Sequence, residues 1–362
     1  MRSDVSWIKL ALNSFKYLLY LFCFSFILIE VLFRILPVSD SYNLQPVNKQ
    51  NPIYHFAKNR EVIRQSGFSF RHIKTKKINN YGYASDKDYL QSDLKKKNLV
   101  AVIGDSYVEA SQVKNIDTFH SILDKQIENL DVYPIGASGA ALSQYLAWAD
   151  FAKNEFNPDI FVFLIIDNDF DKSWYGISNK PGFHFFKENG DLHLVEYSPS
   201  KMKKLLRKSA FIRYLYLDLK ITHRIKKKLG TDNNLNKRLM NTELEIKEVG
   251  NKAIDLFLKK INQLAKERKV ILMLDGDRTS IYKGRVERDK SNITNRWFTN
   301  LLSKGKAQEN PNLYLLDLQP FFAEDWDKNK KFFEYRYDAH WNERGHSVAG
   351  KALADMIKVI EK

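Results

Sequence analysis

The feature that most constrains this fold is a set of short apolar runs, each followed by glycine, serine or acidic residues. The first run, 98–104, has the sequence NLVAVIG and leads directly into Asp105 and Ser106. Its apolar residues do not alternate with polar ones, which is typical of a strand that is buried on both faces of a parallel sheet. Ligands bind at the carboxyl ends of such strands, so we expect Ser106 at a ligand-binding edge.

Three later runs repeat this layout. They are 132–135 before Gly136 and Gly139, 159–166 before Asp167, Asn168 and Asp169, and 313–318, followed after a loop by Asp338 and His340. If the strands are parallel neighbours, one sheet edge gathers a hydroxyl, a glycine backbone, a side-chain amide and a histidine–aspartate pair. These groups supply the nucleophile, base, orienting acid and oxyanion donors that acyl transfer needs.

Four motifs in this order resemble the sequence blocks of the SGNH (GDSL-type) hydrolases. The motifs are GDSYVEA at 104–110, GASG at 136–139, DND at 167–169 and DAHWNERGH at 338–346. The resemblance covers residue 98 to the end of the chain. It implies an α/β fold with a doubly wound, mainly parallel five-stranded sheet in an SGNH or flavodoxin-like three-layer arrangement.

The resemblance also implies a role for each matching residue. Ser106 would be the nucleophile, His340 the general base, and Asp338 the acid that orients the imidazole. The N–H groups of Ser106 and Gly139 and the side-chain amide of Asn168 would form the oxyanion hole. No cofactor and no metal are expected, since the chain lacks an HExxH motif, a P-loop and a GxGxxG motif.

The motifs depart from the family pattern at two places. Ile166 stands where the third block usually has glycine, and the last block is Asp-x-His instead of Asp-x-x-His. The shorter Asp-x-His-Trp form is similar to that of family members that acetylate polysaccharides. Glu334 is an alternative partner for His340, while Asp105 and Asp169 are expected to support the site, Asp169 by bracing its loop.

The length, composition and net charge of the chain restrict its domain size and the kind of partner it can bind. A chain of 362 residues with 44% hydrophobic content can form one large globular domain. The formal net charge of +15 favours an anionic partner. No nucleic-acid-binding motif accompanies that charge, so we expect a membrane surface or an acidic polymer and no nucleic acid. The single cysteine, Cys23, excludes an intrachain disulfide.

The apolar N-terminal segment predicts a membrane anchor. Residues 17–36 contain only two charged residues, Glu30 and Arg34, spaced so that they can pair on a helix. A cleaved signal peptide is the rival interpretation, although no small-x-small cleavage site follows; a core helix is another. Basic residues precede the segment, which predicts a single-pass protein with a cytoplasmic N-terminus and a periplasmic or extracellular catalytic domain.

The segments then divide as follows. Residues 1–37 form the cytoplasmic start and the anchor, 38–97 a stalk and packed extension, and 98–362 the hydrolase domain, with an α+β insertion at about 174–241. Helices are expected at 118–127, 143–156 and 241–268, and after Asn342, which is a candidate N-cap.

The insertion combines a predicted hairpin with a basic segment. The hairpin strands are 183–186 and 192–197, with Gly190 in the turn. Residues 201–228 hold eleven Lys or Arg and one acid, Asp218, and predict an amphipathic helix. Such a helix would lie on anionic lipid or grip an acidic glycan, or it would be a solvated insertion. Its position in the chain would let the insertion roof the site.

Three functions fit these features. The first is a membrane-anchored serine esterase acting on an acetyl ester of a cell-envelope or exported glycan, or on a lipid. The second is a polysaccharide O-acetyltransferase that uses the same site. The third is a non-catalytic module that binds an acidic polymer or a membrane surface through 201–228.

Overall fold

A five-stranded parallel sheet forms the centre of the computed structural model, which describes residues 2–65, 70, 72–95, 97–187, 189–228, 243–336 and 338–362. Its strands are β3 (Asn98–Gly104), β4 (Leu130–Gly136), β5 (Ile160–Ile165), β8 (Lys269–Leu274) and β9 (Leu313–Asp317). They lie in the order β4-β3-β5-β8-β9, and all neighbouring pairs are parallel. The sheet therefore extends to both sides of β3, which confirms the predicted doubly wound topology.

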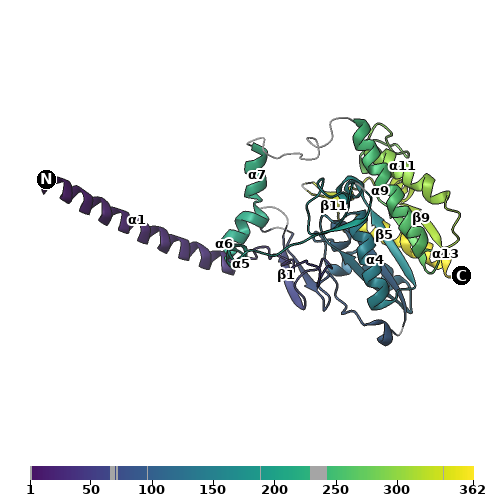
Figure 1. The fold of residues 1–362 in the computed structure, drawn as a ribbon, viewed down its shortest axis with the longest axis horizontal. Coiled ribbons are helices and arrows are strands. Elements are labelled where there is room, and N and C mark those ends of the chain that lie inside the picture. Colours follow the sequence, from purple (N-terminus) through teal and green to yellow (C-terminus); the bar gives the residue numbers. More distant parts are fainter. Residues whose placement is uncertain are drawn as a thin grey trace.

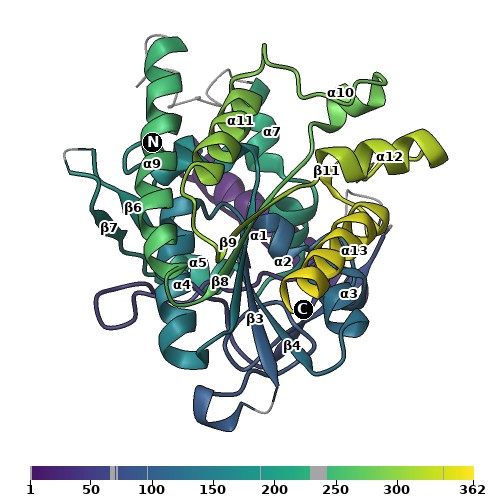
Figure 2. The ribbon, with the colours of Figure 1, turned by 90° about the vertical axis from the view of Figure 1, so that its right-hand side faces the viewer.

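Helices cover both faces of the sheet (Figure 2). One face carries α4 (Leu142–Phe156), α9 (Glu243–Leu264) and α11 (Ile293–Lys306). The other carries α2 (Ser106–Glu109), α3 (Phe119–Gln126), α10 (Arg278–Tyr282), α12 (Gln319–Asn329) and α13 (Glu343–Ile360). Along β3, Leu99, Ala101 and Ile103 enter the first core, whereas Val100 and Val102 enter the second. Burial on both faces explains why the strand sequence does not alternate.

The predicted helices around the first strands are present. Thr118 caps α3 by accepting a hydrogen bond from the Ser121 N–H, and Asn342 caps α13 by accepting from Arg344 and Gly345. The apolar stripe expected over 241–268 is buried or half-buried in α9 where the structure describes it; residues 241 and 242 lie outside the described residues. Short 3-10 helices lie in the connections: η1 (Ser92–Leu94), η2 (Asn115–Asp117), η3 (Asp167–Asp169) and η4 (Asp171–Ser173).

The expected loop between 313–318 and Asp338 is wrong, because α12 occupies most of it. Pro320 lies in the first turn of α12, where its missing N–H costs no hydrogen bond. A short antiparallel pair follows, formed by β10 (Glu334–Tyr335) and β11 (Asp338–Trp341). Asp338 and His340 therefore stand on a strand that precedes α13.

The extension before β3 packs on the domain. It contains an antiparallel pair, β1 (Arg60–Arg64) and β2 (Lys74–Ile78). Its aromatic side chains enter the core beside α4; Tyr83 and Tyr89 are 1% and 2% exposed. The Tyr89 ring stacks on Tyr133 of β4 with a centroid distance of 4.1 Å.

The predicted hairpin in the insertion is confirmed, while the single basic helix is wrong. Strands β6 (Gly182–Phe185) and β7 (Leu192–Val195) pair antiparallel; residue 188 of the turn lies outside the described residues. The basic segment is broken into α5 (Lys201–Leu206), α6 (Ala210–Arg213) with its π-helical continuation η5 (Tyr214–Asp218), and α7 (Ile221–Lys228). Ser209 caps a new helix, and Lys220 has a φ of 50°, which ends the regular helix.

Helix α1 (Arg2–Ile35) projects from the rest of the molecule (Figure 1). Its segment Leu12–Ile35 has a mean hydropathy of 2.2 over its most apolar window, none of which is buried. A helix in a protein core would be buried, so α1 is not a core helix of the described chain. Its length and composition suffice to cross a membrane. Arg34 Nε donates to Glu30 Oε1 at 2.8 Å, as the spacing predicted.

The close approach of α13 to α3 makes Gly350 a testable position. A Cβ at Gly350 would lie 2.8 Å from the Phe119 carbonyl oxygen and 3.0 Å from Ile122 Cβ. Alanine normally favours a helix over glycine by about 0.5–1 kcal/mol. We expect Gly350→Ala instead to lower the free energy of unfolding by about 1–3 kcal/mol, because the backbone of α3 has to shift.

Urea denaturation of the full chain in detergent measures this change. Lys351→Ala, an exposed position on the same helix, is the control and should change the free energy by less than about 0.5 kcal/mol. A Gly350→Ala variant as stable as the wild type would show that the two helices are not tightly packed there.

Candidate active site

Ser106 lies directly after β3, at the carboxyl edge of the sheet, as the sequence predicts. Strand β3 ends at Gly104, and Asp105 caps α2 by accepting a hydrogen bond from the Tyr107 N–H at 2.9 Å. Serine at such a turn often serves as the cap itself. Here Asp105 has that role, so the Ser106 hydroxyl is left for other contacts.

The Ser106 hydroxyl meets His340 and, through it, Asp338. His340 Nε2 lies 2.8 Å from Ser106 Oγ, and His340 Nδ1 lies 2.5 Å from Asp338 Oδ1. The backbone N–H of His340 donates to the same carboxylate oxygen at 3.0 Å. On an extended strand the side chains of residues i and i+2 lie on the same face. Asp338 can therefore reach His340 although only one residue separates them. Gln112 Nε2 donates to the other carboxylate oxygen at 3.3 Å.

Burial and charge set the protonation states of Asp338 and His340. Burial alone would raise the pKa of Asp338, but the hydrogen bonds and charge of His340 lower it to about 2. Burial opposes a charged imidazole, yet the Asp338 carboxylate raises the pKa of His340 above its ordinary value. Neutral His340 keeps its proton on Nδ1, where it faces an ionised carboxylate. Nε2 is then free to accept the proton of Ser106.

Asp105 competes for the same proton. Its Oδ2 lies 2.9 Å from Ser106 Oγ, and the hydroxyl has only one hydrogen to donate. Burial raises the pKa of Asp105 to about 6. Above that pH the serine proton is therefore shared between an ionised Asp105 and His340 Nε2, while a protonated Asp105 is itself a donor to Oγ.

Gly139 and Asn168 flank Ser106 on its two sides. Strand β3 lies between β4 and β5, Gly139 follows β4, and Asn168 follows β5 in η3. Gly139 has a φ of 84°, and its N–H donates no hydrogen bond to any residue that the structure describes. The Asn168 side-chain carbonyl oxygen is buried and unpartnered among the described residues. The side chain as a whole is half-buried, which leaves its NH₂ group as the accessible donor.

Two buried acidic residues, Asp169 and Glu109, hold the loops that carry Asn168 and Gly139. Asp169 is fully buried and accepts the Ile166 N–H at 2.8 Å, as expected for a bracing residue; burial raises the pKa of its carboxyl. Ile166 itself is 2% exposed and joins the apolar core. On the other side, Glu109 Oε2 accepts from the Ser138 N–H at 2.7 Å and fixes the turn before Gly139.

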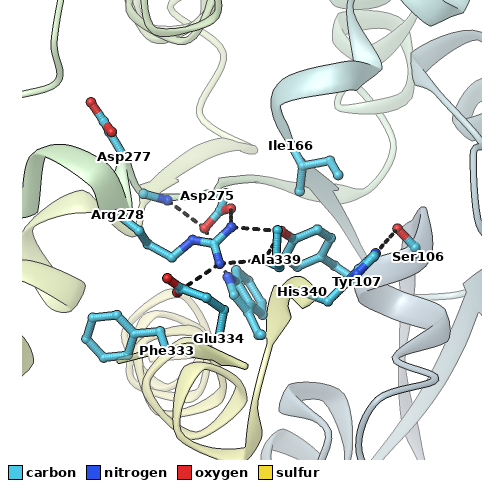
Figure 3. A network of polar contacts seen from close by, with 12 residues as sticks. Ser106, Tyr107, Ile166, Asp275, Asp277, Arg278, Phe333, Glu334, Ala339 and His340 are labelled. Carbon is cyan, nitrogen blue, oxygen red and sulfur yellow. Dashed lines mark hydrogen bonds and ion pairs between the residues drawn. The ribbon is translucent and has the colours of Figure 1, made fainter. Parts of the chain in front are cut away.

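Arg278 and Tyr107 hold the backbone between the two residues of the histidine–aspartate pair (Figure 3). The carbonyl oxygen of Ala339 accepts from Arg278 Nη1 at 2.7 Å and from the Tyr107 hydroxyl at 2.9 Å. Arg278 Nη2 also donates to the Tyr107 hydroxyl at 2.8 Å. Because Ala339 stands between Asp338 and His340, these contacts fix β11 relative to the residue that follows Ser106.

Acidic residues neutralise Arg278 in turn. Arg278 Nη2 lies 3.3 Å from Asp275 Oδ2, and its Nη1 lies 3.2 Å from Glu334 Oε2. Trp341 Nε1 donates to Asp275 Oδ1 at 3.1 Å, and Tyr282 donates to Glu334. Glu334, the alternative partner for His340, thus binds Arg278 and Tyr282. Asp275, the first acid after β8, belongs to this network, whereas Asp277 caps α10. No local sequence pattern indicates that Arg278 reaches Ala339.

The first part of the insertion contributes to the surroundings of Gly139. A small cavity is lined by Ser138, Gly139, Lys180 and Phe183 among others, and the Lys180 side chain passes over Gly139. The basic segment that follows contacts α1 instead: Phe33 packs on Tyr214 with a ring-centroid distance of 4.7 Å. Of the insertion residues that the structure describes, those that line this cavity therefore belong to its first part, whereas the basic segment packs on α1.

No protein-family model and no curated protein matches this chain. It is similar to solved structures at low sequence identity. One is a two-domain esterase active on acetylated mannans (11% identity, TM-score 0.39), where the match covers 73% of this chain and 50% of that one. Another is a member of the lipolytic G-D-S-L family from Veillonella parvula DSM 2008 (15% identity, TM-score 0.38, covering 72% and 98%). A third is an acetyl xylan esterase (14% identity, TM-score 0.39, covering 72% and 99%).

The hydrogen-bond chain predicts that Ser106 reacts with a fluorophosphonate probe. With neutral His340 as the expected proton acceptor, the labelling rate should fall as the pH drops through a value above 6.5, the ordinary pKa of histidine. Asp338→Asn should slow labelling and move this midpoint to lower pH, because the charge that raises the pKa of His340 is lost. Labelling rates of the full chain between pH 5 and pH 9 measure both effects, with Ser106→Ala as the unlabelled control; equal labelling of Ser106→Ala would contradict the assignment.

The Arg278 contacts predict a second effect on reactivity. Arg278→Ala should slow labelling of Ser106 about tenfold or more, since a small displacement of reacting groups is costly. Its pH midpoint should stay close to that of the wild type, because Asp338 is retained. Arg278→Lys should recover part of the rate, and Arg285→Ala, an exposed position nearby, should change nothing. Unchanged labelling in Arg278→Ala would show that β11 holds its position without this residue.

Proposed function

We propose that this protein is a membrane-anchored serine esterase. The observation that carries the proposal is the continuous contact from Asp338 through His340 to the Ser106 hydroxyl, at 2.5 and 2.8 Å. A serine hydroxyl, an imidazole and a carboxylate in this geometry are the parts of a nucleophile activated by a general base.

In the proposed reaction Ser106 attacks the ester carbonyl carbon while His340 Nε2 takes the hydroxyl proton. Asp338 stabilises the imidazolium that forms. The oxyanion is held by the N–H groups of Ser106 and Gly139 and by the Asn168 amide. His340 then protonates the departing alcohol, and the acyl group stays on Ser106.

Water completes the cycle. His340, neutral again, takes a proton from a water molecule that attacks the acyl-serine carbonyl, and the serine hydroxyl is restored as the acid leaves. Every step uses side chains or backbone groups of the chain itself, so the proposed mechanism contains no cofactor.

We further propose that the acyl group is acetyl and that its carrier is a glycan of the cell envelope or an exported glycan. The Asp-x-His-Trp form, Asp338 to Trp341, supports this through its similarity to polysaccharide-acetylating proteins. The same resemblance favours a second function, transfer of acetyl to a sugar hydroxyl that replaces water.

The anchor in this proposal is α1, with the N-terminus in the cytoplasm and the catalytic domain outside it. Support comes from the exposed apolar surface of Leu12–Ile35 and from the basic residues that precede it. Extraction of membranes with sodium carbonate tests the anchor: the full chain should stay with the membrane. Release into the supernatant would remove the anchor from the proposal and leave the esterase intact.

Hydrolysis is tested with the full chain in detergent, using p-nitrophenyl acetate and an O-acetylated xylan. Ser106→Ala should lower kcat/KM by about 10³ or more. Asn168→Ala should lower kcat by about 10²–10³, the cost of one oxyanion donor. Asn329→Ala, an exposed asparagine on α12, is the matched control. Acetate release that survives in Ser106→Ala would contradict the esterase.

The acceptor distinguishes hydrolysis from transfer. With p-nitrophenyl acetate as donor and a deacetylated glycan present, a hydrolase yields free acetate at the same rate as without the glycan. A transferase yields acetylated glycan, detected by mass spectrometry, and releases less acetate. Absence of both products and of probe labelling in a folded sample would favour the non-catalytic binding module.

A further inference from the structure

The insertion is fastened to the C-terminal part of α1 through an acid in the apolar segment. Glu30 accepts hydrogen bonds from the Ser209 hydroxyl at 2.6 Å and from the backbone N–H groups of Ala210 and Phe211 at 2.9 and 3.1 Å. Glu30 thus satisfies the free donors at the start of α6 and complements its helix dipole.

Aromatic contacts extend this junction along α1. The Phe211 ring lies 6.1 Å from Phe26 and 5.3 Å from Phe33, and Tyr214 lies 4.7 Å from Phe33, centroid to centroid. Phe26 precedes Ile35 by about 13 Å of helix at about 1.5 Å per residue. Helix α6 therefore lies beside the part of α1 that the proposed anchor places in one leaflet of the membrane.

The opposite side of α6 and η5 faces an open cavity of about 490 Å³ that α5 also lines. Apolar side chains form much of its wall, including Met202, Leu206, Ile212 and Tyr216. Three of these are strongly exposed: Met202 is 63%, Leu206 41% and Tyr216 58% exposed. A group of large exposed apolar side chains marks a site for an apolar partner.

Two cations lie at the same cavity. Lys203 Nζ lies 5.0 Å from the centre of the Tyr197 ring, and Arg207 Nη2 donates to the Tyr197 hydroxyl at 3.4 Å. Neither forms an ion pair with an acid among the described residues, whereas the neighbouring Arg213 lies 3.5 Å from Asp40. The cavity thus combines an apolar wall with two uncompensated positive charges, which suits a ligand with acyl chains and an anionic head.

We propose that this cavity binds one anionic phospholipid of the leaflet that surrounds the C-terminal end of α1. Lys203 and Arg207 hold the phosphate, and the acyl chains lie over Met202, Leu206 and Tyr216. The site shares α6 and η5 with the α1 junction, so a lipid beside the anchor reaches it without leaving the membrane. The proposal depends on α1 being a membrane span and not on the esterase reaction.

Thermal unfolding of the full chain in a neutral detergent tests this site. The probes are dioctanoyl phosphatidylglycerol, dioctanoyl phosphatidylcholine, glycerol 3-phosphate and polygalacturonate. Phosphatidylglycerol should raise the Tm of the wild type by about 2–4 °C, since a ligand that binds only the folded state stabilises it. The other three probes should leave the Tm within about 1 °C of the value without ligand.

The double variant Lys203→Gln with Arg207→Gln should lose the shift. The matched control is Lys259→Gln with Lys266→Gln, two exposed lysines at a cavity of about 440 Å³ between α9 and α11. It should keep the shift. The Tm of each variant without ligand reports whether it folds. Met202→Gln, which leaves both charges in place, should reduce the shift and so report on the apolar wall.

Several results would overturn the proposal. An equal shift with phosphatidylcholine would remove the anionic specificity, and an equal shift with glycerol 3-phosphate would assign the site to free phosphate. A shift with polygalacturonate alone would make the ligand a glycan. A shift that persists in the Lys203→Gln and Arg207→Gln variant, or no shift in any sample, would leave no lipid site here. Carbonate extraction tests separately whether the chain is anchored in the membrane, so failure of the anchor and failure of the lipid site are distinct outcomes.

Discussion

The contact between His340 Nε2 and Ser106 Oγ joins residues 234 positions apart, and the proposed function depends on it. Each partner is held by a different part of the fold. Ser106 is placed by β3, which is buried on both faces of the sheet. His340 is placed by β11 and by α13, which starts two residues later at its Asn342 cap. The reactive distance is thus a consequence of how the sheet and its last helix pack.

The backbone carbonyl of Ala339 connects those two parts directly. It accepts hydrogen bonds from Arg278 and from Tyr107, the residue next to Ser106. The segment that carries His340 is therefore tied to the segment that carries Ser106, independently of the contact between these two residues. A half-buried, neutralised arginine suits this role because its planar group can donate in several directions at once.

Much of the fold could be predicted from local pattern. The strand runs such as 98–104 are apolar without alternation, and the residues after them fall at one sheet edge because parallel strands all end there. The sequence predicts that Ser106 and His340 lie at this edge, because they follow or precede regular elements with clear sequence signals. Asp338 was separable from Glu334 only in three dimensions, since either acid lies close enough in sequence to reach the imidazole.

Other features of the structure could not be predicted from the neighbouring sequence. Arg278 acts on a carbonyl 61 residues away, and its binding partners come from three separate segments. The basic segment 201–228 has the composition of one amphipathic helix, yet the Ser209 cap and the positive φ at Lys220 divide it. That division depends on Glu30, because the donors of the new helix start are satisfied by a residue in a distant part of the chain.

The Glu30 junction has a consequence for how the protein would work at a surface. A domain joined to a bilayer by a loose tether swings freely and samples a wide shell of substrate. Here the insertion is fastened to α1 at Glu30 and to the segment after α1 at Ser39, whose backbone N–H donates to Asp218 at 3.2 Å. With α1 upright in a bilayer, Ser106 and His340 would stand at one height and one tilt, so the proposed esterase would act on polymer strands at that level in preference to those farther out.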